Sequence, residues 1–412
     1  MFDQTTTLIL AGGRGERLYP LTKTRAKPAV PFGGLYRVID FTLSNCLNSG
    51  VKRAHLLTQY SSLTLDRHVR ESWSGFGREH GMYVELVPPQ GRLVDRWYAG
   101  TADAIYQNLF LLEEERPERV LILSGDHIYK MDYRLFVDAH ERNGADLTVA
   151  VLPVPIETAA NFGVLAIDSH DRITAFSEKP EHPFSVPDDP TRAWVSMGVY
   201  CFRTAELVRC LVSDMQNKNS SHDFGKDVIP WMISNGYRVY GYPFRDENKK
   251  SELYWRDIGS LDQYYASNMD LVAVDPLFNL YDSQWRIRTG HRQDLPPAKT
   301  VFDDDGRRGL AVDSLLAPGV IVSGATVRRS VLSYGCFVHS WATINECILL
   351  PFADVGRHAK IRRAIVEGGV SIAQGDEIGY DPVADAKRFT ITPEGIVVVT
   401  ATDPERRMAS EE

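Results

Sequence analysis

The sequence has few cysteines, and no two of them are spaced like a structural pair. The five cysteines are scattered, odd in number and never arranged as Cys-x-x-Cys. This pattern argues against both a disulfide framework and a structural zinc site. We expect reduced, mostly buried thiols.

Long apolar runs and an excess of positive charge are also absent. The apolar runs are far shorter than the roughly 18 to 20 residues that span a bilayer, and the first residues lack the basic segment of an export signal. Lys and Arg number 46 against 54 Asp and Glu, a formal charge of −8, which argues against nucleic-acid binding through bulk charge. We therefore expect a folded, cytoplasmic protein with no membrane or nucleic-acid partner.

The first part of the chain, residues 1–285, alternates between strand-like and helix-like patterns. Short β-branched runs predict strands at 6–10, 53–58, 120–123, 146–152 and 163–167, and helical patterns cover 103–115 and 132–143. Such alternation predicts an α/β fold with a mostly parallel sheet. Ligands in these folds bind beyond the carboxyl ends of the strands, so motifs directly after strands are the first candidates for a site.

The last part of the chain has a different period. Residues 286–312 are rich in Arg and contain Pro, which predicts a linker or strap. Residues 313–412 form the last expected domain, in which an aliphatic residue recurs about every six positions before a C-terminal tail. The recurring residues are Leu315, Ile321, Val327, Leu332, Val338, Ile344, Leu350, Val355, Ile361, Val366, Ile372 and Ile378. This spacing is typical of a parallel β-helix, although a sandwich of short strands is an alternative.

A glycine-rich loop follows the first predicted strand. It reads Gly12-Gly13-Arg14-Gly15-Glu16-Arg17, and it is neither a Walker A loop nor a dinucleotide-binding fingerprint. Taken alone, it could be a tight turn with solvated arginines or a phosphate site, because glycine lets backbone amides approach a phosphate. Lys27, a further cation in the same connection, favours the phosphate site.

Several motifs follow one another over essentially the whole chain. They are residues 10–22, 25–28, 31–41, 43–50, 57–60, 97–104, 124–129, 176–180, 196–198, 223–227, 254–259, 385–389 and 394–396. Residues 10–22 and 25–28 resemble the signature of sugar-phosphate nucleotidyltransferases, and residues 31–41 and 43–50 narrow the resemblance to the ADP-glucose pyrophosphorylases. The resemblance implies a Rossmann-like nucleotidyltransferase domain followed by a left-handed parallel β-helix.

The resemblance also implies a reaction. ATP and glucose 1-phosphate would give ADP-glucose, which supplies glycogen synthesis, and pyrophosphate, with Mg²⁺ as cofactor. Two alternatives are a related enzyme that uses UTP or dTTP and a catalytically inactive regulatory subunit. The second is disfavoured because Arg17, Lys27, Asp126, Lys179 and Asp257 are all present.

Candidate residues for binding the metal and the phosphates come both from their positions in the sequence and from the resemblance. Asp126 directly follows the strand at 120–123, where a carboxylate can hold Mg²⁺, although it could instead cap the next segment. By resemblance, Asp257 is its counterpart. Arg14, Arg17 and Lys27 suit the β- and γ-phosphates, where they would stabilise departing pyrophosphate.

The nucleoside and the sugar phosphate have candidates mainly by resemblance. Those for ATP are Leu10, Ala11, Gly12, Gly13, Arg14, Gln59, Gly100 and Thr101, and those for glucose 1-phosphate are Tyr98, Gly163, Glu178, Lys179 and Ser196. Without the resemblance, Glu178 and Lys179 would be read as a solvated charge pair. The acidic segment 223–227 is better explained by helix capping through Ser221 or Asp223 than by metal binding, and Asp303 to Asp305 by a solvated loop.

The resemblance further implies an allosteric homotetramer with anionic effectors. Arg25 and Arg37 match arginines implicated in effector binding, and Arg362 lies in a basic segment, 356–363, that could equally be a solvated strand edge. Thr24 stands where some members have a lysine, and Pro31 replaces a polar residue of some relatives. The activator therefore cannot be named from the sequence.

Overall fold

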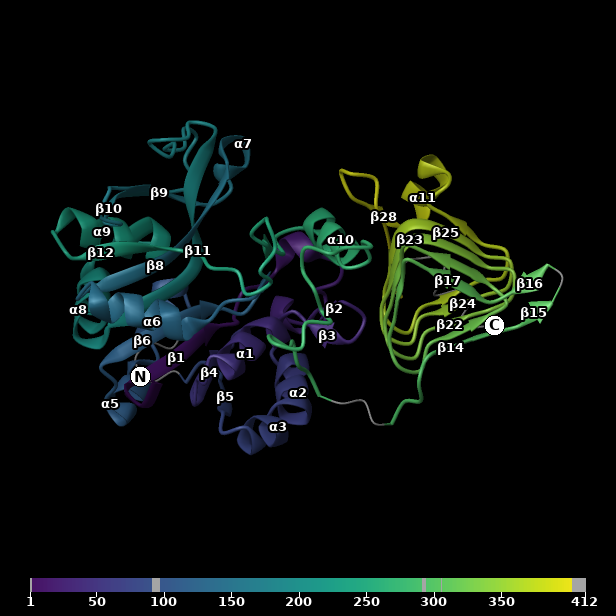
Figure 1. Cartoon of the computed structure of the whole chain (residues 1–412), viewed down its shortest axis with the longest axis horizontal. Coiled ribbons are helices and arrows are strands. Elements are labelled where there is room, and N and C mark those ends of the chain that lie inside the picture. The colour runs from purple at the N-terminus through teal and green to yellow at the C-terminus, as the bar shows by residue number, and fades with distance from the viewer. Residues whose placement is uncertain (1, 91–96, 291–293, 305, 402–412) are drawn as a thin grey trace. The chain divides into compact units, whose positions relative to one another are not determined.

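The computed structural model describes residues 2–90, 97–290, 294–304 and 306–401 (Figure 1). By their contacts these residues form two compact units that interleave along the chain. Unit 1 comprises the residues up to Gly13 together with Thr42–Gly125 and Lys130–Glu247, and unit 2 comprises Arg14–Phe41, Asp126–Tyr129 and the residues from Asn248 onward. The expected division into three consecutive domains, with boundaries at residues 285 and 312, is not the same as this division by contacts, and it stays a prediction. Residues 291–293 and 305 of the expected linker and 402–412 of the tail lie outside the described residues.

Unit 1 is built on a nine-stranded sheet. Its strands are β1 (Thr5–Leu10), β4 (Arg53–Leu57), β5 (Tyr83–Val87), β6 (Arg119–Ser124), β8 (Leu147–Pro155), β9 (Gly163–Ile167), β10 (Ile173–Glu178), β11 (Arg192–Arg203) and β12 (Val239–Pro243). Strands β6, β1, β4 and β5 run parallel in that order, and β12 is parallel to β8. Strand β11 joins β6 to β8 and β9 by antiparallel pairing. The expected strands are all present, and the run at 163–167 has the expected bounds.

Helices cover both faces of this sheet. They are α2 (Leu63–Ser72), α3 (Ser74–Glu79), α4 (Thr101–Tyr106), α5 (Leu109–Glu115), α6 (Tyr133–Arg142), α7 (Ile156–Ala159), α8 (Thr204–Gln216) and α9 (Ile229–Ser234). Helix α1 (Ile39–Asn48) contains the point, between Phe41 and Thr42, at which the chain passes from unit 2 to unit 1. Side chains of α4, α5, α8 and α9 form one apolar core with Leu8, Ile122 and Val149 of the sheet. Helix α6 packs on the other face, where Phe136 contacts Tyr242 of β12.

The helix expected at 103–115 is two helices, α4 and α5. The chain turns at Gln107 and Asn108, whose side chains satisfy the end of α4: Gln107 donates to the Asp103 carboxylate and Asn108 to the carbonyl of Ala104. Amide side chains that bond locally compete with helix continuation, which explains the break. The helix expected at 132–143 is confirmed, with Asp132 as its N-cap.

Unit 2 contains a small mixed part and a β-helix. The small part has the hairpin β2 (Pro31–Phe32) and β3 (Tyr36–Arg37), the pair β7 (His127–Tyr129) and β13 (Trp255–Asp257), and helix α10 (Leu261–Asp270). The β-helix and its end are formed by β14 (Lys299–Val301), β15 (Asp303–Asp304), β16 (Arg307–Arg308), β17 (Leu310–Val312), β18 (Leu315–Leu316), β19 (Ile321–Ser323), β20 (Thr326–Arg328), β21 (Val331–Leu332), β22 (Phe337–Val338), β23 (Thr343–Leu349), β24 (Asp354–Val355), β25 (Lys360–Val366), β26 (Ser371–Ile372), β27 (Glu377–Ile378), α11 (Pro382–Arg388), β28 (Thr390–Ile391) and β29 (Val397–Val399).

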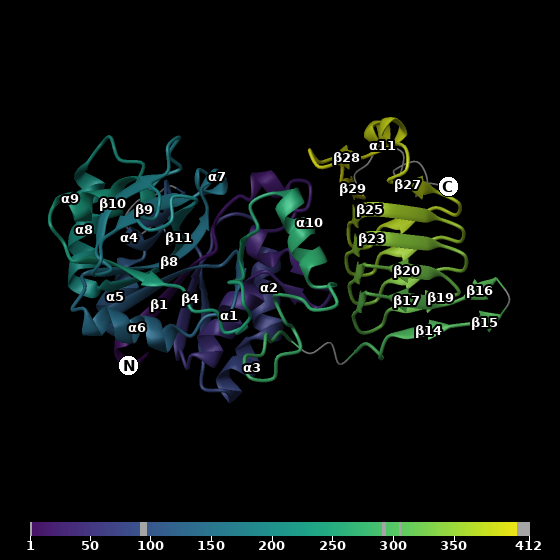
Figure 2. The same cartoon turned by 45° about the horizontal axis from the view of Figure 1, so that its top comes forward.

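Parallel pairing in the β-helix joins residues one coil apart (Figure 2). Val338 pairs with Val355 and Val355 with Ile372, and on another side Val327, Ile344 and Ile361 follow one another, each 17 positions further along the chain. Equivalent aliphatic side chains therefore stack inside the coil. The predicted parallel β-helix is confirmed, and the sandwich alternative is wrong.

The expected six-residue register is wrong at three positions. Leu316, Val322 and Leu349 pack in the interior, not their neighbours Leu315, Ile321 and Leu350. Leu350 is buried on the outside of the coil, in an apolar core that β-helix residues share with Leu18, Val30 and α10. Since both faces of this stretch are apolar, the sequence pattern alone does not separate the inner from the outer residue.

Candidate active site

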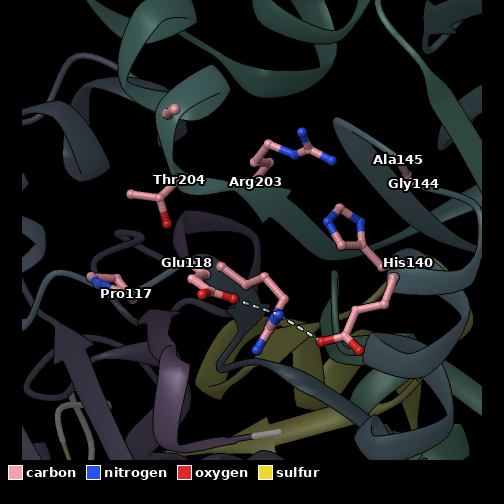
Figure 3. A pocket seen from close by; sticks show the side chains of 10 residues that line it. Pro117, Glu118, His140, Gly144, Ala145, Arg203 and Thr204 are labelled. Atoms are coloured by element: carbon pink, nitrogen blue, oxygen red, sulfur yellow. Dashed lines mark hydrogen bonds and ion pairs between the residues drawn. The ribbon is translucent and has the colours of Figure 1, made fainter.

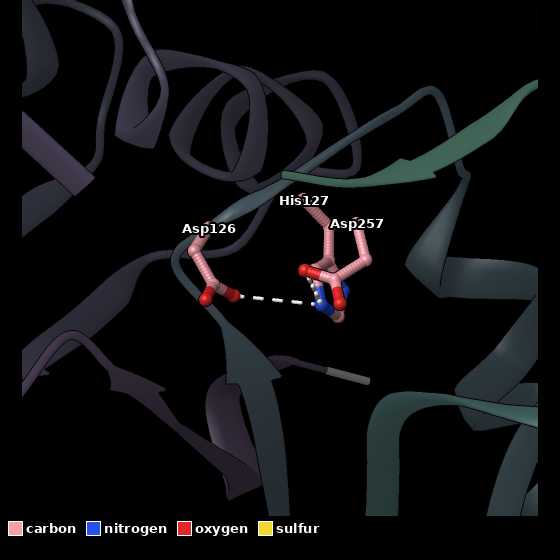
Figure 4. Close-up of side chains that lie close together, drawn as sticks. All are labelled: Asp126, His127 and Asp257. Atoms are coloured by element: carbon pink, nitrogen blue, oxygen red, sulfur yellow. Dashed lines mark ion pairs between the residues drawn. The ribbon is translucent and has the colours of Figure 1, made fainter. Parts of the chain in front are cut away.

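Two aspartates from distant parts of the chain lie side by side in unit 2. Asp126 follows strand β6, and β7 directly after it pairs antiparallel with β13, so that His127 lies opposite Asp257. The ligand atoms of Asp126, His127 and Asp257 lie within 4.8 Å of one another (Figure 4). The pairing of two short strands therefore brings together carboxylates that are about 130 positions apart.

Lys27 connects these two carboxylates. Its Nζ atom lies 2.6 Å from Oδ2 of Asp126 and 3.1 Å from Oδ1 of Asp257, and the residue is 8% exposed. Burial acts to lower the pKa of Lys27, but the two carboxylates outweigh it and raise the pKa above its ordinary value. Lys27 is thus held as an ammonium ion, and the carboxylates converge on a positive charge.

The donor set fits a hard divalent cation. Carboxylate oxygens are the ligands that Mg²⁺ prefers, and it is commonly held by one or two of them together with phosphate oxygens. The imidazole of His127 is a softer ligand, and its Nδ1 is buried without a hydrogen-bond partner among the described residues. Its ring packs edge-on against Trp255 at 5.0 Å. The sequence analysis missed His127 as a member of this cluster, although it directly follows Asp126.

Arg17 lies at the same cluster. It belongs to a single 3₁₀ turn, Glu16–Leu18, which follows Gly15 in a left-handed conformation with φ 65°. A Cβ atom placed on Gly259 would lie 3.4 Å from Nη2 of Arg17 and 3.2 Å from Oδ2 of Asp257. Arg17, Lys27, Asp126 and Asp257 are therefore brought together, and their predicted roles stay predictions. Arg14 is exposed and only 3.5 Å from its neighbour Glu16, so its role stays a prediction.

A second group of predicted residues meets in unit 1, beyond the ends of β1 and β4. A Cβ on Gly12 would lie 3.0 Å from Cβ of Gln59, which leaves no room for a larger side chain. Gln59 Oε1 accepts a hydrogen bond from the amide of Tyr98, whose hydroxyl accepts from Asn108. These contacts hold Gly12, Gln59 and Tyr98 in one place.

Gly100 and Thr101 are locked to the segment around Asp223. A Cβ on Gly100 would lie 2.3 Å from the carbonyl oxygen of His222, so only glycine fits there. Thr101 donates to Oδ2 of Asp223 and accepts from the amide of Phe224. Asp223 also accepts from the amides of Gly225 and Lys226, which confirms the predicted N-cap.

Three of the predicted sugar-phosphate residues, Gly163, Glu178 and Ser196, lie on β9, β10 and β11 of the same sheet. Gly163 pairs with Glu178, and a Cβ on Gly163 would lie 2.5 Å from Cζ of Phe176 and 2.9 Å from Oε2 of Glu178. Burial, together with the charge of Asp223, raises the pKa of Glu178. Ser196 stands at an irregularity of β11, and its hydroxyl accepts from the amide of Gly198.

Lys179 and Gly225 complete this group in different ways. Lys179 is 56% exposed, with Nζ 3.8 Å from Glu178 and φ 49°. Its charge is thus presented to solvent beside a half-buried carboxylate. Gly225 was missed: a Cβ there would lie 2.6 Å from Oε2 of Glu178. Its place in the motif 223–227 was the only signal in the sequence.

Known proteins resemble the chain over nearly its whole length. Residues 6–273 match the nucleotidyl transferase family, and residues 296–399 match the GlmU-like C-terminal hexapeptide family. The glucose-1-phosphate adenylyltransferase of Rhodopirellula baltica is 52% identical over 404 residues, 97% of this chain and 90% of the relative. That of Koribacter versatilis is 50% identical over 399 residues, 96% of this chain and 95% of the relative. The chain belongs to the glucose-1-phosphate adenylyltransferase family.

Membership of this family identifies the chain as a nucleotidyltransferase and its β-helix as left-handed, as predicted. No helix in the described parts of the chain combines the length and the apolar character that crossing a bilayer would need.

The three arginines predicted to bind effectors of this adenylyltransferase lie in unit 2 but differ in their surroundings. Arg25 pairs with Glu367 of the β-helix at 3.0 Å, and its charge acts on nearby Arg37. Arg37 donates to the carbonyl of Ala29. Arg362 is exposed and lies 5.9 Å from the ring centre of Tyr380. Their role in regulation stays a prediction.

Proposed function

We propose that the chain joins ATP and glucose 1-phosphate into ADP-glucose and pyrophosphate. A phosphate oxygen of glucose 1-phosphate attacks the α-phosphorus of ATP, and the bond from that phosphorus to the oxygen bridging to the β-phosphate breaks. Pyrophosphate leaves with the negative charge. The observation that carries this proposal is the cluster of Lys27, Asp126 and Asp257 with Arg17 beside it.

The cations of the cluster act on the phosphates. Arg17 and Lys27 neutralise the charge that develops on the leaving pyrophosphate, which is the main demand of such a transfer. Lys27 is suited to this role because its raised pKa keeps it charged at neutral pH. Arg14, with its exposed guanidinium, reaches the outer phosphates.

Asp126 and Asp257 are the residues that would hold Mg²⁺. The ion would supply further positive charge to the phosphates. When substrates arrive, the ammonium of Lys27 exchanges part of its contact with the carboxylates for phosphate oxygens. His127 packs beside the carboxylates and limits their movement.

The unit 1 residues select the two substrates. The backbone of Leu10 to Gly13 contacts the nucleotide, and Gln59, Gly100 and Thr101 recognise the base. For glucose 1-phosphate, Lys179 binds the phosphate, Glu178 binds sugar hydroxyls, and Gly163 leaves room for the sugar. Tyr98 and Ser196 complete this set.

The proposal extends to the regulation of the enzyme and to its cellular setting. Anionic metabolites bind Arg25, Arg37 and Arg362 and change the rate, and the enzyme works as a cytoplasmic homotetramer that supplies glycogen synthesis. A basic group that pairs with an acidic residue, as Arg25 does with Glu367, can exchange that partner for an anionic effector.

The test is pyrophosphate release from glucose 1-phosphate with ATP, UTP, GTP and dTTP in parallel, each with and without Mg²⁺. We expect a clear preference for ATP and no release without a divalent cation. Parallel reactions with fructose 6-phosphate, fructose 1,6-bisphosphate and pyruvate test regulation. Preference for UTP or dTTP would favour the related enzyme, and inactivity with every nucleotide would favour a regulatory subunit.

A further inference from the structure

A cavity of about 580 Å³ opens at the edge of the unit 1 sheet where β1 and β6 begin (Figure 3). The predicted ATP-binding loops follow the other ends of these strands. With about 3.3 Å per residue, the six residues of β1 place the two edges roughly 20 Å apart. The cavity is therefore distinct from the predicted substrate sites, and its volume lies within the range of small-molecule sites.

Two polar groups in this cavity have unused hydrogen-bonding capacity. Oγ1 of Thr204 is buried and has no partner among the described residues. His140 is 3% exposed and uses Nδ1 toward Thr148 at 2.9 Å, which leaves Nε2 on the cavity side. In Figure 3, Thr204 lies across the hollow from the His140 ring, whereas Arg203 is on the same side as that ring. Buried polar groups in proteins nearly always have partners, so these groups point to a ligand.

The cavity also contains one guanidinium without an ion pair among the described residues. Arg119 pairs with Glu141 at 2.6 Å and lies 3.3 Å from Glu118, so these three residues carry a net charge of −1, and Arg203 brings the charge of the lining to zero. Arg203 forms no ion pair or side-chain hydrogen bond with the described residues. It occupies the N-cap of α8, a helix of 13 residues, and an arginine has no acceptor atom with which to cap it. Both the guanidinium and the uncapped helix end favour an anion.

The rest of the lining is small and apolar. Pro117, Gly144, Ala145 and Ala205 form walls that offer no further charge. One guanidinium, one hydroxyl and one imidazole N–H suit a single carboxylate, which an arginine can bind through both oxygens. The apolar walls suit a compact hydrocarbon body.

We propose that this cavity is a binding site for a small apolar monocarboxylate, held by Arg203, Thr204 and Nε2 of His140. The carboxylate oxygens accept from the guanidinium and from the Thr204 hydroxyl. The proposal assigns the Nε2 tautomer to His140, in which the Thr148 hydroxyl donates to Nδ1 and the ring proton on Nε2 donates to the ligand. The hydrocarbon body lies against Pro117, Ala145 and Ala205.

The probe is benzoate, with benzamide as its uncharged counterpart, titrated into the full chain and followed by calorimetry and by the ring resonances of His140. We expect benzoate to bind and shift the His140 resonances, and benzamide to bind at least about ten-fold more weakly, as befits a charge-assisted contact. Arg203→Gln should weaken benzoate binding about ten-fold or more, and Thr204→Val should weaken it several-fold.

The matched control is Arg209→Gln, which removes an exposed arginine of the same helix that pairs with Glu206 and does not line the cavity. It should bind benzoate like the unaltered chain. Equal binding of benzoate and benzamide, equal affinities of Arg203→Gln and Arg209→Gln, or unmoved His140 resonances would each overturn the proposal. Displacement of benzoate by equimolar inorganic phosphate would overturn the assignment to a monocarboxylate.

Discussion

Parallel strand pairing occurs both in the β-helix of unit 2 and in the sheet of unit 1, but it serves different purposes in the two regions. In the β-helix each strand leads into the next coil, and Val327, Ile344 and Ile361 stack on one another with a 17-residue spacing. In unit 1 each strand leads into a different loop: β1 into the glycine-rich segment and β6 into the turn before Asp126. Repetition places identical apolar groups in register, whereas unlike loops bring unlike polar groups together. The comparison predicts that substitutions at the strand ends affect chemistry and that substitutions inside the coil affect stability.

The largest effect is expected for Asp126→Asn. The change removes one of the two negative charges that face Lys27 and the metal, and we expect turnover to fall by about 10³-fold, as for the loss of a main electrostatic group. Asp257 keeps its 3.1 Å contact with Lys27, so the thermal midpoint should stay within a few degrees. Steady-state kinetics and thermal unfolding measure the two effects.

The control for this change is Asp138→Asn, on α6, which pairs with Arg142 on the surface. It should leave both turnover and the midpoint unaltered. An Asp126→Asn enzyme with near-normal turnover would contradict the proposed role of the carboxylates.

The converse effect is expected inside the β-helix, for Ile344→Ala. Ile344 is fully buried between equivalent residues of the adjacent coils, and truncation of such a side chain typically costs about 2 to 5 kcal/mol of unfolding free energy. The folded fraction should keep its turnover. Urea unfolding of the full chain measures the loss.

Lys360→Ala provides the comparison, because Lys360 lies on the adjacent coil and forms an exposed ion pair with Glu377. Exposed pairs are worth little, so its loss should leave the unfolding free energy nearly unchanged. A similar cost for both variants would show that the coil interior is not the source of stability.

The sequence predicts the β-helix more completely than it predicts the candidate site. The β-helix can be predicted because its interior residues recur at a regular spacing. The pattern nevertheless assigned Leu350 to the interior, whereas the residue that lies there is its neighbour Leu349. Both residues are apolar because the coil is buried on two sides there, and a periodic pattern cannot separate two apolar neighbours.

The candidate site was predictable only in part. Asp126 was found from its place after a strand, but its contact with Asp257 depends on the pairing of β7 with β13, which no local pattern encodes. His127 and Gly225 were missed because an imidazole or a glycine beside a carboxylate has many ordinary explanations. The structure adds the close approach of Gly225 to Glu178 that gives this glycine a reason.

A smaller, more selective effect is expected for Gly163→Ala. The added Cβ would lie 2.5 Å from Phe176 and 2.9 Å from Glu178, so the carboxylate proposed to bind sugar hydroxyls must move. We expect KM for glucose 1-phosphate to rise about ten-fold, the cost of one misplaced hydrogen bond to a charged group, with little change in KM for ATP. Initial rates with either substrate varied provide the measurement.

Gly75→Ala is the matched control, since a Cβ there would meet nothing within 4 Å. It should change neither constant. A parallel rise of both KM values in Gly163→Ala would indicate general damage to the sheet and not a displaced Glu178.

The smallest effect concerns pH and again separates the two regions. Burial and the nearby charges of Arg119, Arg203 and Arg238 lower the pKa of His140 in unit 1 to about 4. In the unfolded chain the pKa is about 6.5, so the unfolded state binds more protons between these values. The stabilisation is fully present above pH 6.5 and is lost as the pH falls toward 4. The coil interior of the β-helix holds Cys336 and Cys347, whose burial raises the pKa of each thiol to about 12, and neither titrates in this range.

Urea unfolding at pH 7.5, 6.5 and 5.5 tests this difference. We expect His140→Asn to reduce the loss of unfolding free energy between pH 6.5 and 5.5 by on the order of 1 kcal/mol, while the exposed His170→Asn leaves it unchanged. Glu115 does not titrate in this interval. Burial acts to raise its pKa, but hydrogen bonds with His55 and Thr6 outweigh burial and lower the pKa to about 2. Its stabilisation is complete above pH 4.5, outside the interval measured. If His140→Asn and His170→Asn showed the same pH dependence, the buried imidazole would not be the group that makes unit 1 sensitive to acid.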